Sequence, residues 1–155
     1  MKVKELTNWL DGRYPADMAE HWDNVGLLVG DDEAEVHHVL LALDLTEKTL
    51  DEAISAGADM IITHHPMIFE GQKKINNHSF TGRRILKLIR NRIQYYAMHT
   101  NYDVLGMAEL SADYLKLTDR EVLSVTAHTE QGEEGFGRVG WITTIKPVCQ
   151  FLYLH

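Results

Sequence analysis

The sequence has little of what marks a secreted, membrane-bound or nucleic-acid-binding protein. Its one cysteine, Cys149, cannot form an intrachain disulfide, so cysteine usage gives no sign of an oxidising compartment. No apolar run approaches the roughly 18 residues that a membrane-spanning helix needs, and residues 1–5 lack the apolar core of a signal peptide. Fifteen basic residues against 23 acidic ones give a net charge of −8, which disfavours nucleic acid and anionic membranes as partners. We therefore expect a cytoplasmic protein.

What remains is the composition of an ordinary folded domain. The 155 residues are 45% hydrophobic and 25% charged, and this length suits a single domain spanning residues 1–155. Short apolar runs alternate with helix-like patterns between residues 36 and 115, which predicts right-handed βαβ units. The expected fold class is therefore α/β, with three layers in which helices flank a mostly parallel sheet.

The predicted elements follow from apolar spacing and from the residues that begin or end helices. Strands are expected at residues 25–29, 36–43, 59–63, 93–98, 121–127 and 138–144. Helices are expected at 3–11, at 46–57 with Thr46 as cap and Gly57 as stop, from Ser79 or Thr81 to 90, and at 107–115. An acidic, glycine-rich loop is expected at 129–137, and a last helix could begin at Lys146. The pattern also predicts which side chains are buried. We expect residues 39–43 to be covered on both faces of the sheet. The helix residues expected to face the core are Ile85, Leu88 and Ile89 in one helix and Met107, Leu110 and Tyr114 in another.

Polar side chains follow three consecutive predicted strands. Asp44 follows one strand, His64 and His65 follow the next, and His99 follows the one after, with Asp103 four residues later. Ligands of an open parallel sheet bind at the carboxyl ends of its strands, and neighbouring strands lie about 4.8 Å apart. These side chains could therefore share one ion or a pair of ions.

The His64-His65 pair needs a break in the strand if both rings are to serve one site. Successive side chains of a regular strand point to opposite faces, and Pro66 favours such a break because it cannot donate a backbone hydrogen bond. The alternative is a pair of partly exposed loop histidines, which is the more frequent case for an isolated pair. His37-His38 has no such cluster near it in the sequence, and we interpret it as an exposed pair.

The chemistry of these side chains indicates a metal site. Imidazole and carboxylate ligands together suit zinc, iron or manganese, and no cysteine is placed to support a structural zinc site. Two ions held roughly 3.5–4 Å apart could activate a water and clamp phosphoryl or carbonyl oxygens. His99 could be a direct ligand or a buried histidine that supports the ligands, and the residues alone leave both roles open.

Other motifs indicate less. Residues 135–140 match the string G-x-G-x-x-G, but two glutamates precede them and a strand pattern follows, whereas a dinucleotide-binding loop opens a helix. We interpret them as a turn into a strand. The basic side chains of the helix at 79–90 predict a solvated face, with phosphate capture or a subunit contact as the alternative: Arg83, Arg84, Lys87 and Arg90.

Four motifs carry a family resemblance. They occur in the order Trp22-Asp23-Asn24-Val25-Gly26-Leu27, Ala42-Leu43-Asp44-Leu45-Thr46, Ile62-Thr63-His64-His65-Pro66 and His99-Thr100-Asn101-Tyr102-Asp103. Together they resemble the amino-terminal half of the Nif-three-like family, whose members are also called GTP cyclohydrolase 1 type 2 homologues. Residues 135–140 extend the resemblance, which covers most of residues 1–140.

The resemblance implies an α/β fold with a dinuclear centre of divalent metal ions and, in several relatives, a ring-shaped homohexamer. It implies that His64, His65 and Asp103 are metal ligands, with His99 and Asp44 close beside them. It also implies a metal-dependent hydrolase that acts on a nucleotide or another phosphate-bearing small molecule. The alternative is a non-catalytic metal-binding scaffold or protein-interaction module.

The chain stops short of the family pattern. Relatives continue for roughly another domain's length, with a His and a Glu in the carboxy-terminal segment that complete the metal centre. We therefore expect this chain to be a fragment, a truncated gene product or a natural short form. His128, Glu130 or a neighbouring subunit would then have to supply the missing ligands.

Overall fold

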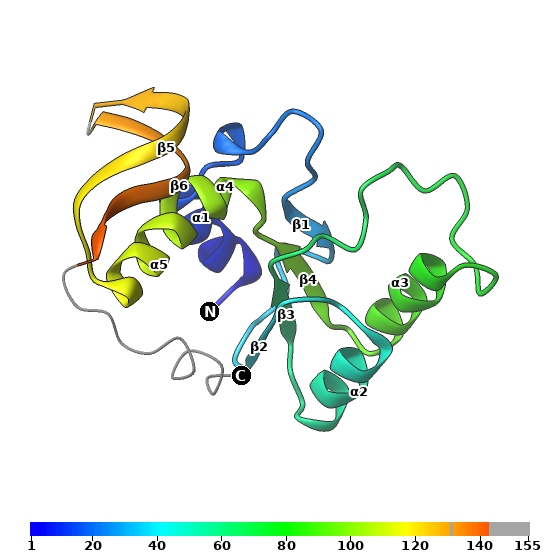
Figure 1. Ribbon diagram of the computed structural model, residues 1–155. Helices are drawn as coiled ribbons and strands as arrows, with labels where there is room; N and C mark the ends of the chain where they lie inside the picture. Colours follow the sequence, from blue (N-terminus) through cyan, green and yellow to red (C-terminus); the bar gives the residue numbers. More distant parts are fainter. Residues whose placement is uncertain (131, 143–155) are drawn as a thin grey trace. The chain divides into compact units, whose positions relative to one another are not determined.

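The computed structural model describes residues 1–130 and 132–142 (Figure 1). The chain divides after Tyr102 into two compact units, Met1–Tyr102 and Asp103–His155, whereas the sequence pattern suggests one domain. Each unit has its own sheet, with four strands in the first and two in the second. Within the described ranges, no helix is both long enough and apolar enough to cross a membrane.

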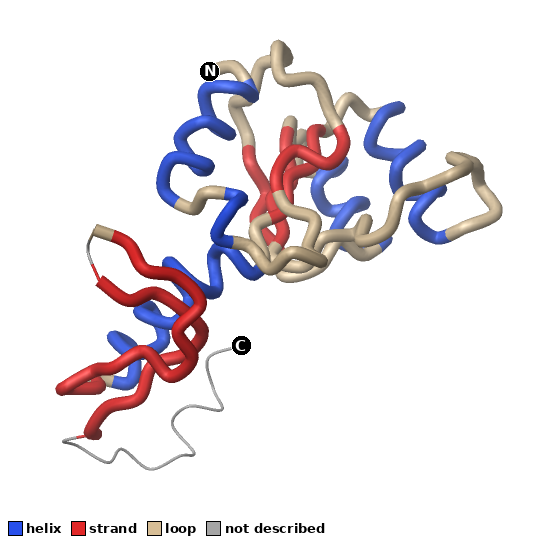
Figure 2. Tube along the Cα trace, turned by 90° about the horizontal axis from the view of Figure 1, so that it is seen from above, coloured by secondary structure: helices blue, strands red, loops and turns tan. Residues whose placement is uncertain are grey.

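The first unit is a four-stranded sheet with helices on both faces (Figures 1 and 2). Its elements are α1 (Val3–Arg13), η1 (Ala16–Met18), β1 (Gly26–Val29), β2 (Val39–Ala42), α2 (Glu47–Ser55), β3 (Met60–Thr63), α3 (Phe80–Arg90), β4 (Gln94–Ala97) and α4 (Thr100–Tyr102). The strand order is β1-β4-β3-β2, in which β2, β3 and β4 are parallel and β1 is antiparallel to β4. The predicted α/β class with a mostly parallel sheet between helices is confirmed.

The two faces of the sheet belong to separate apolar clusters, because neighbouring residues of a strand point to opposite sides. Tyr95 packs on one face with residues of α2 and α3, including Leu50. The next residue, Tyr96, packs on the other face with residues of α1, including Val3. Both tyrosines are almost completely buried. This burial on two sides fixes the register of β4 and so the position of the residues that follow it.

The helices α2 and α3 begin at side-chain caps. The Thr46 hydroxyl accepts a hydrogen bond from the Thr49 amide at 3.0 Å, and the Ser79 hydroxyl accepts one from the Gly82 amide at 3.0 Å. Gly57 follows α2 with a φ of +66°, a left-handed conformation that glycine adopts without steric cost. The limits of these helices are therefore set by local residues, as the sequence predicts.

Two burial predictions in this unit are wrong. The sequence predicts that β2 is covered on both faces, but β2 lies at the edge of the sheet, where Val39 and Leu41 are 41% and 75% exposed. The inner face of α3 contains Ile85 and Leu88, whereas Ile89 is 57% exposed. A run of apolar residues identifies an element, but it does not reveal whether a neighbouring element covers it.

The second unit consists of a π-helical turn, a helix and a β-hairpin. Its elements are η2 (Asp103–Met107), α5 (Ala108–Leu115), β5 (Leu117–Thr129) and β6 (Gly132–Ile142). The predicted loop at 129–137 is wrong in extent, because β6 already pairs with β5 from Gly132. Gly135 lies against β5, since a Cβ there would be 1.9 Å from the Ser124 carbonyl oxygen. The G-x-G-x-x-G string at 135–140 therefore lies wholly within β6, so the predicted strand is present but the predicted turn into it is not.

The helix α5 buries different residues from those predicted. Ala108 and Ala112 are buried, whereas Leu110 and Tyr114 are 58% and 55% exposed. The side of α5 that faces the rest of the second unit therefore carries small side chains, and apolar spacing alone selected the larger ones. The predicted helix near Lys146 lies outside the described residues.

Candidate metal centre

The carboxyl ends of the parallel strands bring four predicted polar residues to one edge of the sheet in the first unit. Asp44 follows β2, His64 and His65 follow β3, and His99 follows β4. Because the three strands run in the same direction, these residues leave the sheet at the same end. The burial of Tyr95 and Tyr96 fixes the register of β4 and therefore the position of His99 at this edge.

The two histidines after β3 leave the strand through a turn that Tyr95 holds. The Tyr95 hydroxyl accepts a hydrogen bond from the Met67 amide at 2.8 Å and donates one to the His65 carbonyl oxygen at 3.2 Å. Thr63 Oγ1 donates to the same carbonyl oxygen at 2.8 Å. The ring centroids of His64 and His65 are 4.9 Å apart, so the predicted break in the strand is present.

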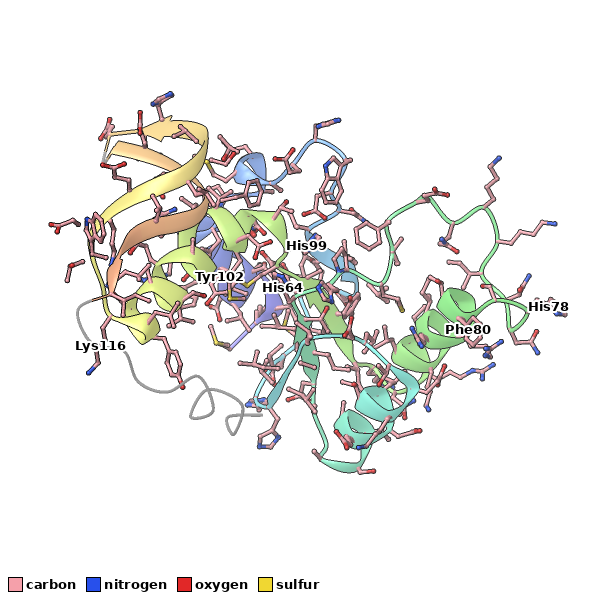
Figure 3. All side chains as sticks on the ribbon, in the orientation of Figure 1. His64, His78, Phe80, His99, Tyr102 and Lys116 are labelled. Atoms are coloured by element: carbon pink, nitrogen blue, oxygen red, sulfur yellow. The ribbon has the colours of Figure 1, made fainter. Side chains whose placement is uncertain are left out.

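His99 joins this pair to form a cluster of three histidines, of which His64 and His99 are labelled in Figure 3. Its ring centroid lies 5.1 Å from that of His64 and 5.6 Å from that of His65. One nitrogen of each ring lies within 4.8 Å of one nitrogen of the other two, a spacing that could hold a metal ion. In the part of the chain that the structure describes, no other group of three metal-competent side chains has this spacing.

Each ring of the cluster is held through its Nδ1 atom by an oxygen acceptor. The pairs are His64 Nδ1 with the Met98 carbonyl oxygen at 3.1 Å, His65 Nδ1 with Asp44 Oδ1 at 2.8 Å, and His99 Nδ1 with both Asp23 carboxylate oxygens at 3.0 Å. Because carbonyl and carboxylate oxygens only accept, the neutral ring carries its proton on Nδ1 and its lone pair on Nε2. Metal-binding histidines are typically oriented in this way.

Asp23, which holds His99, is a site residue that strand-end reasoning does not find. It precedes β1, and because β1 is antiparallel to β4, this segment reaches the edge where β4 ends. The Asp23 side chain is fully buried and also accepts hydrogen bonds from the Thr100 hydroxyl and amide. Burial raises the pKa of Asp23, but the hydrogen bonds from Thr100, His99 and the Asn24 amide outweigh it, so the pKa lies below its usual value. Asp23 is therefore a buried carboxylate that orients His99.

Two half-exposed aromatic rings border the cluster. Trp22 and Phe69 are 52% and 50% exposed. Each ring lies edge-to-face with His99, with ring centroids 6.0 Å apart. A molecule that reaches the cluster would therefore contact aromatic surface.

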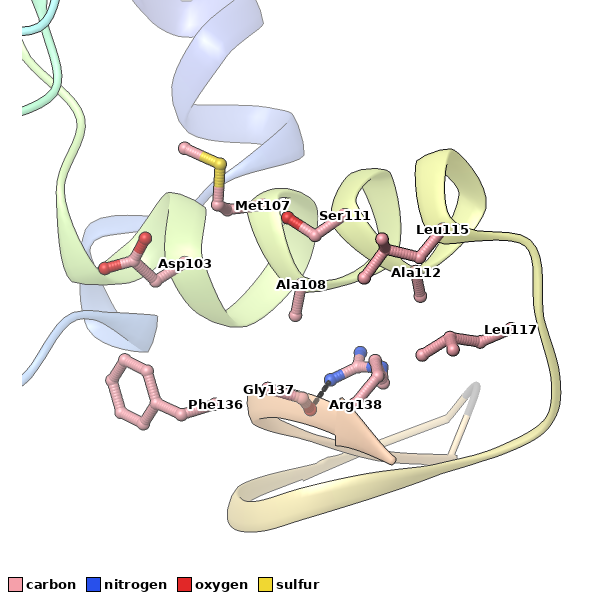
Figure 4. A pocket seen from close by; sticks show the side chains of 10 residues that line it. All are labelled: Asp103, Met107, Ala108, Ser111, Ala112, Leu115, Leu117, Phe136, Gly137 and Arg138. Carbon is pink, nitrogen blue, oxygen red and sulfur yellow. Dashed lines mark hydrogen bonds between the residues drawn. The ribbon is translucent and has the colours of Figure 1, made fainter. Parts of the chain in front are cut away.

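Asp103, the third ligand that the resemblance implies, is the first residue of the second unit and of η2. Its side chain lines a pocket of about 250 Å³ in that unit (Figure 4). Figure 4 shows it at the same end of the pocket as Phe136, with Arg138 farther along. π-Helical turns are rare in proteins, and those that occur are often found at functional sites. The assignment of Asp103 as a metal ligand stays a prediction.

The other histidine pair has a different environment. The backbone amides of His37 and His38 donate to Asp59 Oδ2 at 2.8 and 2.9 Å. The His37 side chain is 63% exposed, with Nε2 at 3.4 Å from a Glu35 oxygen. Neither ring belongs to a metal-competent group among the described residues. The interpretation of this pair as exposed histidines is confirmed.

The sequence as a whole matches one protein family, Duf34/NIF3 (NGG1p interacting factor 3), over residues 1–153. The chain belongs to this family. A GTP cyclohydrolase 1 type 2 homolog from Clostridium acetobutylicum is 38% identical over 96% of this chain, and one from Streptomyces coelicolor is 37% identical over 92%. The resemblance carried by the four motifs is therefore confirmed.

Solved structures of the Duf34/NIF3 family have the same fold. A Bacillus cereus protein related to NIF3 has a TM-score of 0.76 and 42% identity, covering 82% of this chain and 35% of its own. Reduced HcgD from Methanocaldococcus jannaschii has a TM-score of 0.78 and 28% identity, covering 98% of this chain and 58% of its own. The chain spans about half the length of the curated relatives it matches, 57% and 50% of the two from Clostridium and Streptomyces.

Proposed function

We propose that the histidine cluster binds up to two divalent metal ions, zinc, iron or manganese, and that the complete protein is a metal-dependent hydrolase of a nucleotide or another phosphate-bearing small molecule. The observation that carries this proposal is the anchoring of three rings at Nδ1 within one cluster. Neutral imidazoles with Nε2 lone pairs are suitable donors for all three metals. The residues present therefore fit a divalent ion.

The proposed ligands are those that the family resemblance implies, His64, His65 and Asp103. Two carboxylates that hold imidazole rings support the part of the proposal that concerns the histidine cluster. Asp44 accepts from His65 and Asp23 accepts from His99, and such acceptors raise the basicity of the opposite ring nitrogen. We therefore assign Asp44 and Asp23 to positioning the rings.

In the proposed reaction, the metal ion and the residues of the chain would have different roles. A divalent ion held at the cluster would supply Lewis acidity towards a phosphoryl or carbonyl oxygen. The residues of the chain would keep the imidazoles in one orientation and present the aromatic surface of Trp22 and Phe69 to the substrate. Preorganised groups of this kind need little rearrangement during reaction.

Elemental analysis tests the metal site. Wild-type protein, His64→Ala and Asp103→Ala would be purified without a chelator and analysed for zinc, iron and manganese. We expect a divalent metal in the wild type and less of it in both variants. Equal metal content in all three proteins would refute the ligand assignment.

A hydrolysis screen tests the reaction class. Nucleotides and phosphoesters would be incubated with the protein in the presence of added manganese, zinc or iron. Product formation that disappears in His65→Ala supports the hydrolase. A full-length relative that is inactive across the screen would instead support a non-catalytic scaffold.

The scaffold is a second candidate because the second unit exposes large apolar side chains. Leu123 is 69% exposed and Trp141 is 73% exposed, and large exposed apolar side chains can contribute to a protein interface. Under this proposal the surface contacts a second copy of the chain in a homo-oligomer, up to the hexamer that the resemblance implies. Light scattering that gives a monomer at all concentrations would contradict it.

A further inference from the structure

The first unit has a cavity that adjoins the histidine cluster. It has a volume of about 550 Å³, and its lining includes His65 and Asp44, which also belong to the cluster and its supports. Phe69, the aromatic ring that contacts His99, lines it as well. A molecule in this cavity would therefore lie beside the proposed metal site.

The cavity has one cationic side chain, Arg84 of α3. The Arg84 side chain is only 24% exposed, and its Nε atom is buried without a hydrogen-bond partner among the described residues. It forms an ion pair with Glu47 Oε1 at 3.6 Å, which is too long for a hydrogen bond, and Glu47 Oε1 likewise has no hydrogen-bond partner among the described residues. A buried donor that makes no hydrogen bond is costly, so the ion pair with Glu47 leaves the guanidinium incompletely satisfied, and an oxyanion in the cavity could complete its hydrogen bonding.

The neighbouring Arg83 shows the ordinary fate of a basic side chain on this helix. Its Nη1 donates to the Asn77 carbonyl oxygen at 3.2 Å, and its guanidinium lies 4.7 Å from the centroid of the Phe80 ring. Arg83 does not line the cavity beside the cluster. Two successive arginines thus differ: Arg83 donates a hydrogen bond within the chain, whereas the buried Arg84 Nε has only a long ion pair with Glu47 and no hydrogen bond among the described residues.

The rest of the lining is largely apolar. Phe69 is 50% exposed, and Met67 and Pro66 lie in the cavity wall with it. Apolar lining with a few placed polar groups is typical of small-molecule sites. The wall therefore suits the body of a small molecule, and the guanidinium suits its charged group.

We propose that this cavity is a substrate subsite in which Arg84 binds an oxyanion group and Phe69 packs against a planar ring. An arginine fork matches the oxygens of a phosphoryl or carboxylate group and can bind two of them at once. The ligand class is a ring compound with an oxyanion substituent. Its role as a substrate rests on the proposed hydrolase function, whereas its binding does not.

The test measures binding without metal, so that the cluster cannot capture the anion. Chelator-treated protein would be titrated with phenyl phosphate, inorganic phosphate and benzoate, and the dissociation constants measured by NMR chemical-shift changes. We expect phenyl phosphate to bind more tightly than inorganic phosphate, because only the former offers a ring to Phe69. The comparison of phenyl phosphate with benzoate identifies the preferred oxyanion, and tight binding of either one supports the subsite.

Matched variants locate the binding. Arg84→Gln should raise the dissociation constant for phenyl phosphate by about tenfold or more, the loss expected for a hydrogen bond to a charged group. Arg83→Gln should leave it unchanged, and Arg84→Lys should restore part of the affinity. Phe69→Ala should weaken phenyl phosphate but not inorganic phosphate. Wild-type affinity in Arg84→Gln, or an equal loss in Arg83→Gln, would overturn the proposal, as would no binding of any probe to the wild type.

Metal content separates this proposal from the hydrolase. Arg84→Gln should retain the metal content of the wild type, because Arg84 holds none of the cluster rings. If the wild type contains no metal but the Arg84 effect on phenyl phosphate is present, the subsite stands and the hydrolase fails. If metal and activity are present but Arg84→Gln binds the probe normally, the hydrolase stands and the subsite fails.

Discussion

Two His-His pairs in the first unit have the same sequence and different surroundings. After β3, the rings of His64 and His65 are held at Nδ1, and His99 lies beside them. Before β2, the backbone amides of His37 and His38 donate to Asp59, the His37 ring meets only the exposed Glu35 carboxylate at 3.4 Å, and both histidines are exposed. The first pair follows the carboxyl end of a central strand, where other strand ends supply acceptors, whereas the second pair precedes an edge strand.

The difference teaches that anchoring of the rings, rather than the dipeptide, identifies the candidate metal centre. A histidine ring in solvent has neither a fixed tautomer nor a fixed orientation. A ring held at Nδ1 offers one nitrogen in one direction, which is what coordination requires. Variants of the two pairs and of their supports can therefore break or sharpen this comparison.

Removal of a ring from the anchored pair is expected to have the largest effect. We expect His64→Ala to lower Zn²⁺ affinity by more than the roughly 10–100-fold that loss of an outer partner causes. His37→Ala is the matched control and should leave the affinity unchanged, because its ring is 63% exposed. Competition with a chromogenic chelator measures both affinities. Equal losses in the two variants would remove the distinction between the pairs.

The buried carboxylate behind His99 should have the next largest effect. Asp23→Asn replaces an acceptor with a group that is partly a donor, so we expect roughly a 10–100-fold loss of Zn²⁺ affinity. Asp44→Asn should cost less, because the Asp44 side chain is 54% exposed and water can replace it, whereas that of Asp23 is fully buried. The same competition titration ranks them. A larger loss in Asp44→Asn would show that burial does not determine the contribution of these supports.

The turn after β3 should contribute less to metal affinity and more to stability. Tyr95→Phe leaves the Met67 amide without its acceptor, which should lower the free energy of unfolding by about 1–3 kcal/mol. We expect only a few-fold loss of Zn²⁺ affinity, because Thr63 still donates to the His65 carbonyl oxygen. Urea denaturation and chelator competition measure the two quantities. An unchanged unfolding free energy would contradict the role given to Tyr95.

Asp59 tests the exposed pair through pH. The hydrogen bonds from the His38 and His37 amides hold the pKa of Asp59 below its usual value. A carboxyl group with a lowered pKa stabilises the fold above its unfolded pKa of about 3.9, and this contribution is lost as the pH falls through the folded value. The free energy of unfolding of the wild type should therefore exceed that of Asp59→Asn by about 1 kcal/mol at pH 7, and this difference should shrink in acid. The Zn²⁺ affinity of the two proteins should be the same. Urea denaturation between pH 7 and pH 3 checks this, and a difference independent of pH would contradict it.

Much of the first unit follows from local patterns in the sequence. Thr46 and Ser79 cap helices where the sequence predicts, and the apolar run before His64 is the expected strand. The errors concern coverage, since Leu41 and Ile89 are apolar but exposed. Coverage depends on strand order and on where a helix crosses the sheet, and neither property is encoded in a window of a few residues.

The candidate metal centre likewise has residues that the sequence predicts and one that it does not. The positions of His64, His65 and His99 follow from the rule that parallel strands end at one edge, and the structure brings these rings together. Asp23 lies 76 residues before His99, and their contact depends on β1 pairing with β4 in the antiparallel direction. The Trp22-Asp23-Asn24 motif is part of the family resemblance, but nothing in its spacing indicates that Asp23 contacts His99.

Nitrogen-15 NMR of the histidine rings, before and after addition of Zn²⁺, is the most direct test of the anchored cluster. The account predicts that His64, His65 and His99 are protonated at Nδ1 in the metal-free protein and that zinc shifts their Nε2 resonances. The ring-nitrogen resonances of His37 and His38 should not shift when zinc is added. Rings of the cluster that exchange between tautomers, or zinc-induced shifts at His37 and His38 but not at the cluster, would contradict the account.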